Sequence, residues 1–498
     1  MKKICKLFAL LSVFLLVLFV AACGDDNETA EEPDETYVEA DPDEDGDAEP
    51  EPEPEPEPEV EDEEDDEPAI AIVDDEEVTL TYVNWNLGGE GYDNIERRMV
   101  AAFMDRYPHI RIEFIEGFLP SEETSWVEHL AIAASTGDLP DVFMVHDIGV
   151  MLANGWVYDL TDIANANNEF MDLPQATRDI TIVNGSVYSV PFAQHMMGFF
   201  VNQDLFDSLN LDAPTYGFSI DDLTDALSQI TDLNAPTIGT SHFDNFTEWY
   251  PATVNSDMGF FTFDGESFHL DSDEMREGVA LATELMASDV AFDALDEDIR
   301  GTFNGGWGGE VFFNGQMGLL WDGTWASGNI ADQSDFAWDF IGIPGGRPLV
   351  TMDILAVAAT SEHPEEAYLF AKWMGFGSDG FEMRMQIAEE MGEVINTIPL
   401  TTDQAVLDQF FDILGVDGIV EAHGRLDEAV IDFNKFVPGW TNARFYGATE
   451  VAIGDNDNAT IGDFMWNTIR GYVNFNDYAA RLNEVAQEAF DAATAEIE

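Results

Sequence analysis

Hydrophobic and polar positions along the globular part of the chain predict strands that alternate with helices. Residues 78–85 (VTLTYVNW) and 110–115 (IRIEFI) have the composition and alternation of two strands. Residues 94–107 carry apolar side chains at helical spacing between them. The next stretch predicts a further helix and a short apolar strand, residues 126–135 and 142–145. Strands and helices that alternate at this spacing indicate an α/β fold with a mainly parallel sheet.

The N-terminal region differs from the rest. Residues 1–22 combine a positive start with an apolar run that is short for a membrane span, as in a secretory signal peptide. The small residues before Cys23 (VAAC) resemble the lipobox of bacterial lipoproteins, which implies that Cys23 is lipidated. Residues 23–76 are rich in Glu and Pro, which predicts a disordered acidic linker. The roughly 420 residues that follow are too many for one core, so we expect two lobes.

The charge of the chain is extreme, with 101 acidic against 18 basic residues and a net charge of −83. Residues 24–67 hold 26 of the acids, but the remaining mature chain still has 75 acidic against 15 basic residues. Such a field disfavours binding to nucleic acid, to anionic lipid surfaces and to strongly anionic ligands. It also suggests adaptation to high salt or high pH, where counterions screen the repulsion.

The sequence contains few signs of catalysis or of a cofactor. The chain has two cysteines, Cys5 and Cys23, and Cys5 lies in the segment expected to be removed, so no internal disulfide is expected. We find no P-loop, no G-x-G-x-x-G, no G-x-S-x-G and no H-E-x-x-H motif, and the eight histidines are scattered. The sequence therefore predicts a binding protein without metal or cofactor rather than an enzyme. A surface glycosidase remains an alternative, because paired carboxylates are uninformative in so acidic a chain.

Several motifs resemble family 1 of the extracellular solute-binding proteins, the group that contains the maltodextrin-binding proteins. They keep the family's order and are spread over about residues 78 to 375. The resembling segments are WNLGGEGY (85–92), STGDLPDVFMVHD (135–147), NGWVYDL (154–160), NGSVYSVP (184–191), FFVNQDLF (199–206), FNGQMGLLWDGTW (313–325) and SEHPEEAYLFAKW (361–373).

The resemblance implies the type II periplasmic-binding-protein-like fold, in which two α/β lobes enclose a ligand cleft. If this chain has the family's fold, it crosses between the lobes near residues 192–198, 343–347 and 394–401. The first lobe then comprises residues 77–193 plus 346–395, and the second comprises residues 194–343 plus 400–498. Asp141, at the start of a buried strand after a proline, is expected to have a structural role.

The same resemblance implies a function. The protein would be a monomeric lipoprotein on the extracytoplasmic face of the cell membrane, attached through its lipid anchor only. It would bind a carbohydrate, expected to be an oligosaccharide, and deliver it to the permease subunits of an ABC importer. Alternatives that remain are a binding protein for a polyamine or quaternary ammonium solute, since acids and aromatics also bind cations, and a lipoprotein for surface adhesion or sensing.

Ligand contacts are expected where aromatic and planar polar side chains follow strands or occupy the crossovers. Sugars present apolar C–H faces and rings of hydroxyls, which such side chains recognise. Eight residues are predicted to bind the ligand: Trp85, Asp147, Gln194, His195, Trp249, Trp325, Asp353 and Trp440. For Asp147 the alternative is an N-cap of the helix that begins at Ile148.

Two departures from the maltodextrin-binding pattern narrow the expected ligand. The first loop has Gly89 and Glu90 where those proteins place an aspartate and a lysine, and Ser327 stands where they carry a second tryptophan. An oligosaccharide other than maltodextrin is therefore expected.

Overall fold

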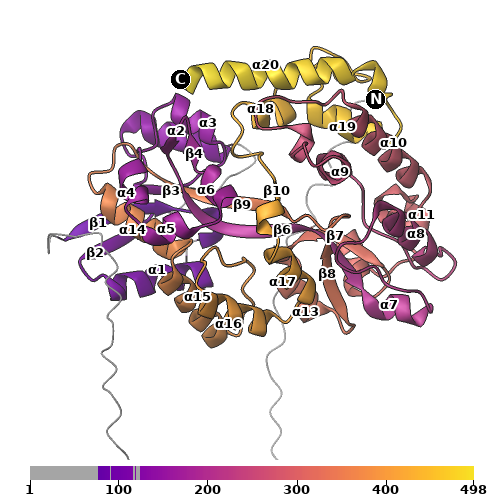
Figure 1. Cartoon of the computed structure of the whole chain (residues 1–498), viewed down its shortest axis with the longest axis horizontal. Helices are drawn as coiled ribbons and strands as arrows, with labels where there is room; N and C mark the ends of the chain where they lie inside the picture. The colour runs from indigo at the N-terminus through magenta and orange to yellow at the C-terminus, as the bar shows by residue number, and fades with distance from the viewer. Residues whose placement is uncertain (1–76, 90, 116–117, 119–123, 498) are drawn as a thin grey trace, which may run out of the picture. The chain divides into compact units, whose positions relative to one another are not determined.

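The computed structural model describes residues 77–89, 91–115, 118 and 124–497, which all belong to one compact unit (Figure 1). The predicted signal peptide, Cys23 and the linker lie outside the described residues. The strands are β1 (Val78–Val83), β2 (Ile110–Phe114), β3 (Val142–Met144), β4 (Ile182–Val183), β5 (Ser186–Val187), β6 (Val190–Asn202), β7 (Leu319–Gly323), β8 (Trp338–Gly342), β9 (Leu349–Val357) and β10 (Val430–Ile431).

Eight of these strands form one sheet in the order β2-β1-β3-β9-β6-β7, with β10 beside β9 and β8 beside β6. β1 pairs parallel with β2 and β3, and β10 pairs parallel with β9. β9 is antiparallel to β3 and β6, and β6 is antiparallel to β7 and β8. The expectation of a mainly parallel sheet therefore holds for β2-β1-β3 and for β10-β9, and it is wrong for the pairs that β9 makes with β3 and β6 and that β6 makes with β7 and β8. β9 runs in the direction opposite to that of its neighbours β3 and β6, which makes both pairs antiparallel.

Helices pack around the eight-stranded sheet (Figure 1). The helices before β7 are α1 (Ile95–Arg106), α2 (Trp126–Thr136), α3 (Ile148–Ala153), α4 (Thr161–Asn165), α5 (Asn168–Asp172), α6 (Gln175–Asp179), α7 (Gln203–Ser208), α8 (Ile220–Ile230), α9 (Phe246–Val254), α10 (Asp273–Ala287), α11 (Glu297–Arg300) and α12 (Gly308–Phe313). Those after it are α13 (Ser327–Gln333), α14 (Pro364–Met374), α15 (Ser378–Met391), α16 (Gln404–Leu414), α17 (Asp417–His423), α18 (Trp440–Phe445), α19 (Ile461–Ile469) and α20 (Ala479–Ile497).

Local sequence signals explain where the first elements begin and end. Asn94 caps α1 by accepting a hydrogen bond from the backbone N–H of Arg97 (3.0 Å). Ser125 and Glu128 form a capping box at the start of α2, and Gly137 ends that helix in the left-handed conformation with φ 83°. The strands and helices predicted over residues 78–145 are thus confirmed to within a few residues.

Asp141 has the structural role expected of it. Its carboxylate accepts hydrogen bonds from the backbone N–H (2.9 Å) and hydroxyl (2.7 Å) of Thr81 in β1, and from the hydroxyl of Ser361 (2.7 Å). Thr81 also accepts a hydrogen bond from the Asp141 N–H (2.9 Å). The carboxylate therefore ties β1 to the start of β3 and to the loop that follows β9.

The buried apolar side chains form two clusters. The first core is built around β1, β3, β9, α1 and α14, with Leu80, Phe103 and Phe370 fully buried. The second core is built around α8, α9, α10 and the C-terminal helices, with Trp249 and Trp440 among its largest side chains. β6 contributes side chains to both clusters, so this strand connects the two cores.

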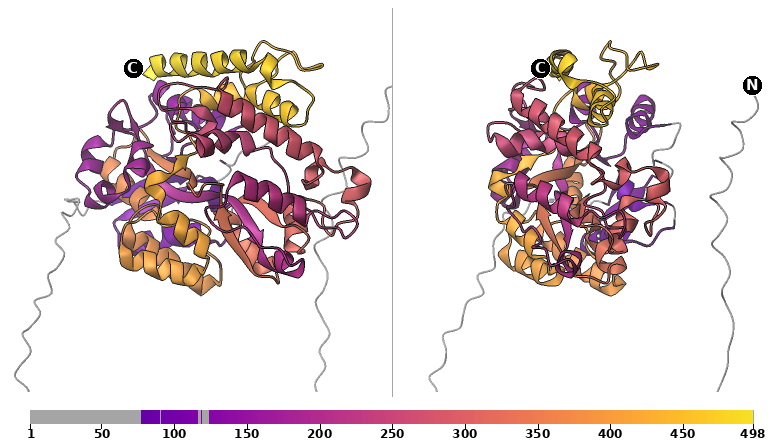
Figure 2. Two further views of the ribbon diagram at one scale, coloured as in Figure 1. Left: turned by 45° about the vertical axis from the view of Figure 1, so that its right-hand side comes forward. Right: turned by 90° about the vertical axis from the view of Figure 1, so that its right-hand side faces the viewer.

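The segment after α15 lies against β6. Gln194 accepts hydrogen bonds at its backbone oxygen from the N–H of Ile398 (2.9 Å) and from the hydroxyl of Thr397 (3.2 Å). Farther along, α16 packs against α15, α17 packs against β8, and α20 packs against α18 and α3 (Figure 2). α16 and α17 thus contribute buried side chains to the first core, and α18, α19 and α20 contribute theirs to the second.

Candidate ligand-binding site

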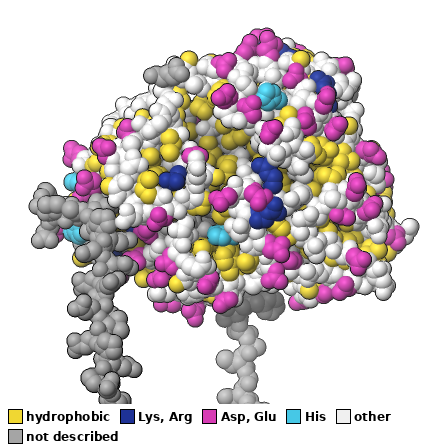
Figure 3. Space-filling view, viewed as in Figure 1, with side chains coloured by type: hydrophobic (Ala, Val, Ile, Leu, Met, Phe, Trp, Pro, Cys, Tyr) yellow, Lys and Arg dark blue, Asp and Glu magenta, His cyan; other side chains and the backbone are white. Residues whose placement is uncertain are grey.

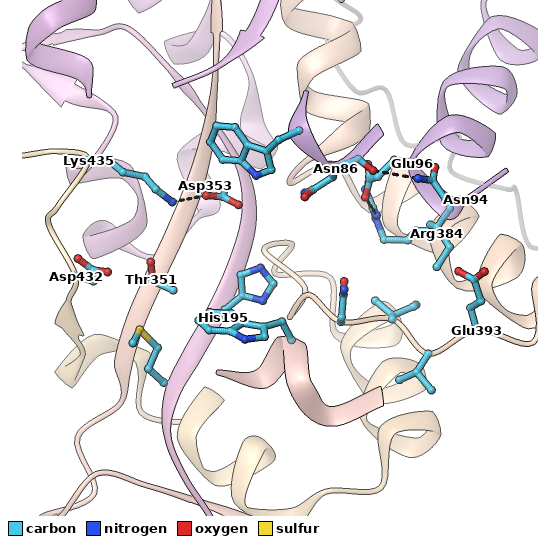
Figure 4. A pocket seen from close by; sticks show the side chains of 17 residues that line it. Asn86, Asn94, Glu96, His195, Thr351, Asp353, Arg384, Glu393, Asp432 and Lys435 are labelled. Carbon is cyan, nitrogen blue, oxygen red and sulfur yellow. Dashed lines mark hydrogen bonds and ion pairs between the residues drawn. The ribbon is translucent and has the colours of Figure 1, made fainter. Parts of the chain in front are cut away.

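A cavity of about 620 Å³ opens where segments distant in the sequence meet (Figure 4). Its walls come from the loop after β1 and the start of α1, from the middle of β6 and β9, from the turn after β7, and from the segments around residues 384–396 and 432–435. Acidic side chains are spread over the molecular face drawn in Figure 3, where basic ones are few. The cavity wall is different, because Arg384 and Lys435 lie there among four carboxylates.

Trp85 forms one aromatic wall. It begins a short 3-10 turn (Trp85–Leu87) directly after β1, and Asn84 caps this turn by accepting a hydrogen bond from the N–H of Asn86 (2.7 Å). The indole of Trp85 meets the ring of Trp126 edge to face, with 5.2 Å between centroids. Trp126 is itself buried and donates its indole N–H to the carbonyl of Met144 (2.8 Å). Trp85 is thus held in place by a core side chain.

Trp325 forms a second aromatic surface, in the turn that follows β7. Its indole is 38% exposed, lines the cavity and meets His195 edge to face at 5.2 Å. The ring lies over Gly323, where an added Cβ would come within 2.4 Å of it. The neighbouring Thr324 accepts a hydrogen bond from the backbone N–H of Met196 in β6 (3.1 Å). The turn and β6 together fix where this ring lies.

His195 projects from β6 into the cavity wall as a neutral side chain. Burial is the main cause that lowers the pKa of His195 to about 4, and the positive charge of Lys435 lowers it further. The negative charge of Asp353 and a hydrogen bond to the backbone of Asn396 oppose this shift. At neutral pH the imidazole therefore carries no charge and serves as a polar, hydrogen-bonding surface.

Two ion pairs lie on the cavity wall (Figure 4). Lys435 pairs with Asp353 of β9, and both side chains are largely buried. Arg384 of α15 pairs with Glu96 of α1 and also donates to the carbonyl of Met374 (3.0 Å). Because both bases of the wall already have carboxylate partners, they present fixed hydrogen-bonding groups rather than free charges.

Two of the predicted contact residues, Trp249 and Trp440, belong to the core instead. Trp249 is 1% exposed and stacks on Trp321 at 5.8 Å. Trp440 is fully buried, stacks on Phe268 at 4.8 Å and donates its indole N–H to Asn434 (2.8 Å). Both side chains belong to helices, α9 and α18, and are buried in the second core, so the expectation that they contact the ligand is corrected.

Asp147 and Gln194 also lie elsewhere than expected. Asp147 is buried and caps α3 by accepting a hydrogen bond from the N–H of Val150 (3.2 Å), while burial raises the pKa of its carboxyl. Gln194 is buried on the face of β6 opposite to His195, because side chains alternate along a strand. Neither residue lines the cavity. Trp85, His195, Trp325 and Asp353 do line it, and their contact with a ligand stays a prediction.

Sequence reasoning missed several residues of the wall. Lys435 and Arg384 were not predicted, and neither were Asn86, Asn94 or Asn396. For Asn396, the predicted crossover at 394–401 was a usable signal, since crossovers border the cleft. Lys435 was one of only two lysines after the signal peptide, but no local pattern indicated that it faces a cavity.

The described residues show neither a metal centre nor a membrane span. Among them, no group of three or more His, Cys, Asp or Glu side chains is placed to hold a metal ion. Within the same residues, no helix is both long and apolar enough to cross a membrane.

Comparison with known proteins places the chain in a family. Residues 90–375 match the bacterial extracellular solute-binding protein family, which is more than half of the chain. The protein therefore belongs to this family of solute-binding proteins. No curated protein matches the sequence.

Solved structures share the fold. An ABC substrate-binding protein from Listeria monocytogenes in complex with cycloalternan is 20% identical, with a TM-score of 0.56, over 85% of this chain and 98% of that chain. A sugar transporter from Rhizobium etli in an open conformation is 16% identical, with a TM-score of 0.60, over 82% and 98%. The cyclic α-maltosyl-1,6-maltose binding protein of Arthrobacter globiformis is 17% identical, with a TM-score of 0.59, over 83% and 99%. The fold is type II periplasmic-binding-protein-like, with two α/β lobes and a ligand cleft between them.

Proposed function

We propose that the protein is the extracytoplasmic binding component of an ABC importer and that its ligand is a carbohydrate, specifically an oligosaccharide. One observation carries this proposal: Trp85 and Trp325 line the same cavity. Aromatic faces stack on the apolar C–H surfaces of sugar rings and exclude water from neighbouring hydrogen bonds. Asn86, Asn396 and Thr351 lie on the same wall and supply donors and acceptors for hydroxyl groups.

The size of the cavity and the fold support the same ligand class. About 620 Å³ is within the range of about 300–1,000 Å³ that is usual for small-molecule sites. The three neighbours above are a substrate-binding protein in complex with cycloalternan, a sugar transporter and a cyclic α-maltosyl-1,6-maltose binding protein. Family membership supports binding without turnover. Incubation of the protein with α-glucans or xylo-oligosaccharides should therefore release no product.

A calorimetric titration of the purified protein tests the ligand class. The panel contains linear and cyclic α-glucans and xylo-oligosaccharides, with spermidine and glycine betaine as the competing class. We expect saturable binding of at least one neutral oligosaccharide and none of the cations. Saturable binding of a polyamine or betaine, with no heat from any sugar, would reject the carbohydrate proposal.

Binding should close the two lobes, because a ligand that contacts both walls stabilises the closed form by its differential affinity. The sequence predicts residues 77–193 plus 346–395 in one lobe and residues 194–343 plus 400–498 in the other. Because α16 packs against α15, we propose instead that α16 belongs to the first lobe and that the last crossing follows Leu414. Small-angle scattering should show a smaller radius of gyration with ligand. An unchanged radius at saturation would contradict closure.

The proposed location rests on the N-terminal sequence. We propose that Cys23 carries the lipid anchor of a monomeric lipoprotein and that the acidic surface is an adaptation to high salt or high pH. Cys23→Ser should release the protein from washed cells without changing its affinity, and retention on the membrane would refute the anchor. Equal melting temperatures in low and molar salt would contradict the adaptation.

A further inference from the structure

Lys435 is one of only two lysines in residues 24–498, and it lies on the cavity wall. Its backbone is fixed from two sides. The Lys435 carbonyl accepts a hydrogen bond from the N–H of Ile148 (3.0 Å). The adjacent Asn434 accepts side-chain hydrogen bonds from Trp440 (2.8 Å) and Arg444 (3.0 Å) in the second core. The backbone position of Lys435 is therefore fixed by hydrogen bonds to other elements of the fold.

Three kinds of group surround the Lys435 ammonium. Asp353 supplies a carboxylate, Met352 supplies a carbonyl oxygen at 3.3 Å from Nζ, and the ring of Trp85 has its centroid 5.9 Å from Nζ (Figure 4). A carboxylate, a carbonyl and an aromatic face are the groups with which proteins bind ammonium ligands. The cavity thus contains a cation subsite, and the protein's own side chain occupies it.

We propose that Lys435 is a specificity-determining residue that fills this subsite and thereby excludes cationic solutes in favour of neutral ones. This inference rests on the proposed carbohydrate-binding function and names how the site selects its ligand. So acidic a protein concentrates cations around its surface, and aromatic walls with carboxylates would otherwise hold them. A ligand cation entering the wild-type cavity finds Asp353 already neutralised by Lys435, and finds the place beside the Trp85 ring already occupied by the Lys435 ammonium.

The remaining carboxylates of the wall do not replace this subsite. Glu96 is paired with Arg384, and Asp432 accepts a hydrogen bond from the N–H of Asn434 (3.0 Å). Glu393 is exposed. None of these three is among the groups that surround the ammonium of Lys435, so selection against cations is expected to depend on Lys435.

The other lysine provides a matched control. Lys372 forms an ion pair with Glu169, and the exposed fractions of those side chains are 14% and 22%, against 24% and 14% for Lys435 and Asp353. Lys372 does not line the cavity. Removing either lysine changes the net charge equally and breaks one comparable ion pair, but only removal of Lys435 vacates the subsite.

The experiment compares Lys435→Met, Lys372→Met and the wild type by calorimetric titration with choline and with spermidine. Methionine keeps most of the side-chain volume and ends one atom short of the ammonium position. We expect Lys435→Met to bind at least one of these cations about tenfold or more tightly than the other two chains, a difference of about 1.4 kcal/mol. Equal cation affinities in the three chains would overturn the proposal, as would tight cation binding by the wild type.

Two further variants and a separate titration of the wild type keep the result interpretable. Lys435→Gln, which is neutral but keeps a donor for Asp353, should show the same gain if Lys435→Met proves too unstable to titrate. Lys435→Arg, which keeps the charge, should continue to exclude both cations, and a gain there would count against the proposal. The wild type is titrated separately with neutral oligosaccharides: no binding in that arm rejects the carbohydrate proposal, whereas the cation comparison alone decides the role of Lys435.

Discussion

The tryptophans of the cavity and those of the second core have the same side chain but different surroundings. Trp325 is 38% exposed and follows a strand, whereas Trp440 is fully buried at the start of a helix. Both were expected to contact a ligand, and each packs against another ring, Trp325 against His195 and Trp440 against Phe268. What separates them is the packing around each ring, since α20 and Phe268 cover Trp440 while the cavity leaves one side of Trp325 open.

Ion pairs show the same contrast between cavity and core. Glu248 and Arg444 pair inside the second core, where burial raises the pKa of Glu248 and the charge of Arg444 opposes that rise. Asp353 and Lys435 pair on the cavity wall, next to space that a ligand can enter. The core pair serves the fold, because an uncompensated buried charge is costly. The Asp353–Lys435 pair lines the cavity, so a change in it can alter which ligands bind.

Trp440→Ala should have the largest effect and should act on stability. Removing a fully buried tryptophan is expected to cost about 3–5 kcal/mol of unfolding free energy, measured by chemical denaturation. The exposed Trp307 (53%), which does not line the cavity, provides the control, and Trp307→Ala should change stability little. A Trp440→Ala variant as stable as the wild type would break the distinction between core and cavity.

Trp325→Ala should have a smaller effect and should act on binding. We expect oligosaccharide affinity to fall by about 2 kcal/mol or more, roughly thirtyfold, as for other buried aromatic anchors. The melting temperature should stay close to that of the wild type, because the ring is already partly exposed. Calorimetry and thermal melting on the same sample check both quantities, with Trp307→Ala again as the control. Unchanged affinity in a folded variant would remove Trp325 from the site.

The pH dependence of affinity should be the smallest effect. The pKa of His195 is lowered to about 4, so the imidazole of the folded protein stays neutral and affinity should be flat from pH 8 to about 5. Stability behaves differently. Histidine in the unfolded chain titrates near 6.5. The unfolded state therefore binds more protons between pH 6.5 and 4, and stability falls as pH falls through that window.

His423 provides a control for this prediction, because burial also lowers its pKa to about 4 while it lies outside the cavity. His195→Gln and His423→Gln should both reduce the loss of stability at low pH. Only His195→Gln should alter ligand affinity. Affinity that declines with a midpoint near pH 6.5 would show that His195 is not held neutral in the cavity.

Much of the fold was predictable because its signals are local. Asn94 and Gly137 mark the ends of helices through their own capping geometry, and Asp141 follows a proline at a strand start. The family motifs place Trp85 and Trp325 directly after strands, where loops border a cleft in open α/β sheets. Such features depend on a few neighbouring residues, so one sequence contains enough information to find them.

The sequence by itself therefore determined the α/β class, the family and four of the residues that line the cavity. Tertiary structure decided the direction of β9, the burial of Trp249 and Trp440, and the pairing of Lys435 with Asp353 across 82 residues of chain. The physical reason is that periodicity reports which face of an element is apolar. It does not report which distant element covers that face, and a cavity exists only where such a cover is missing.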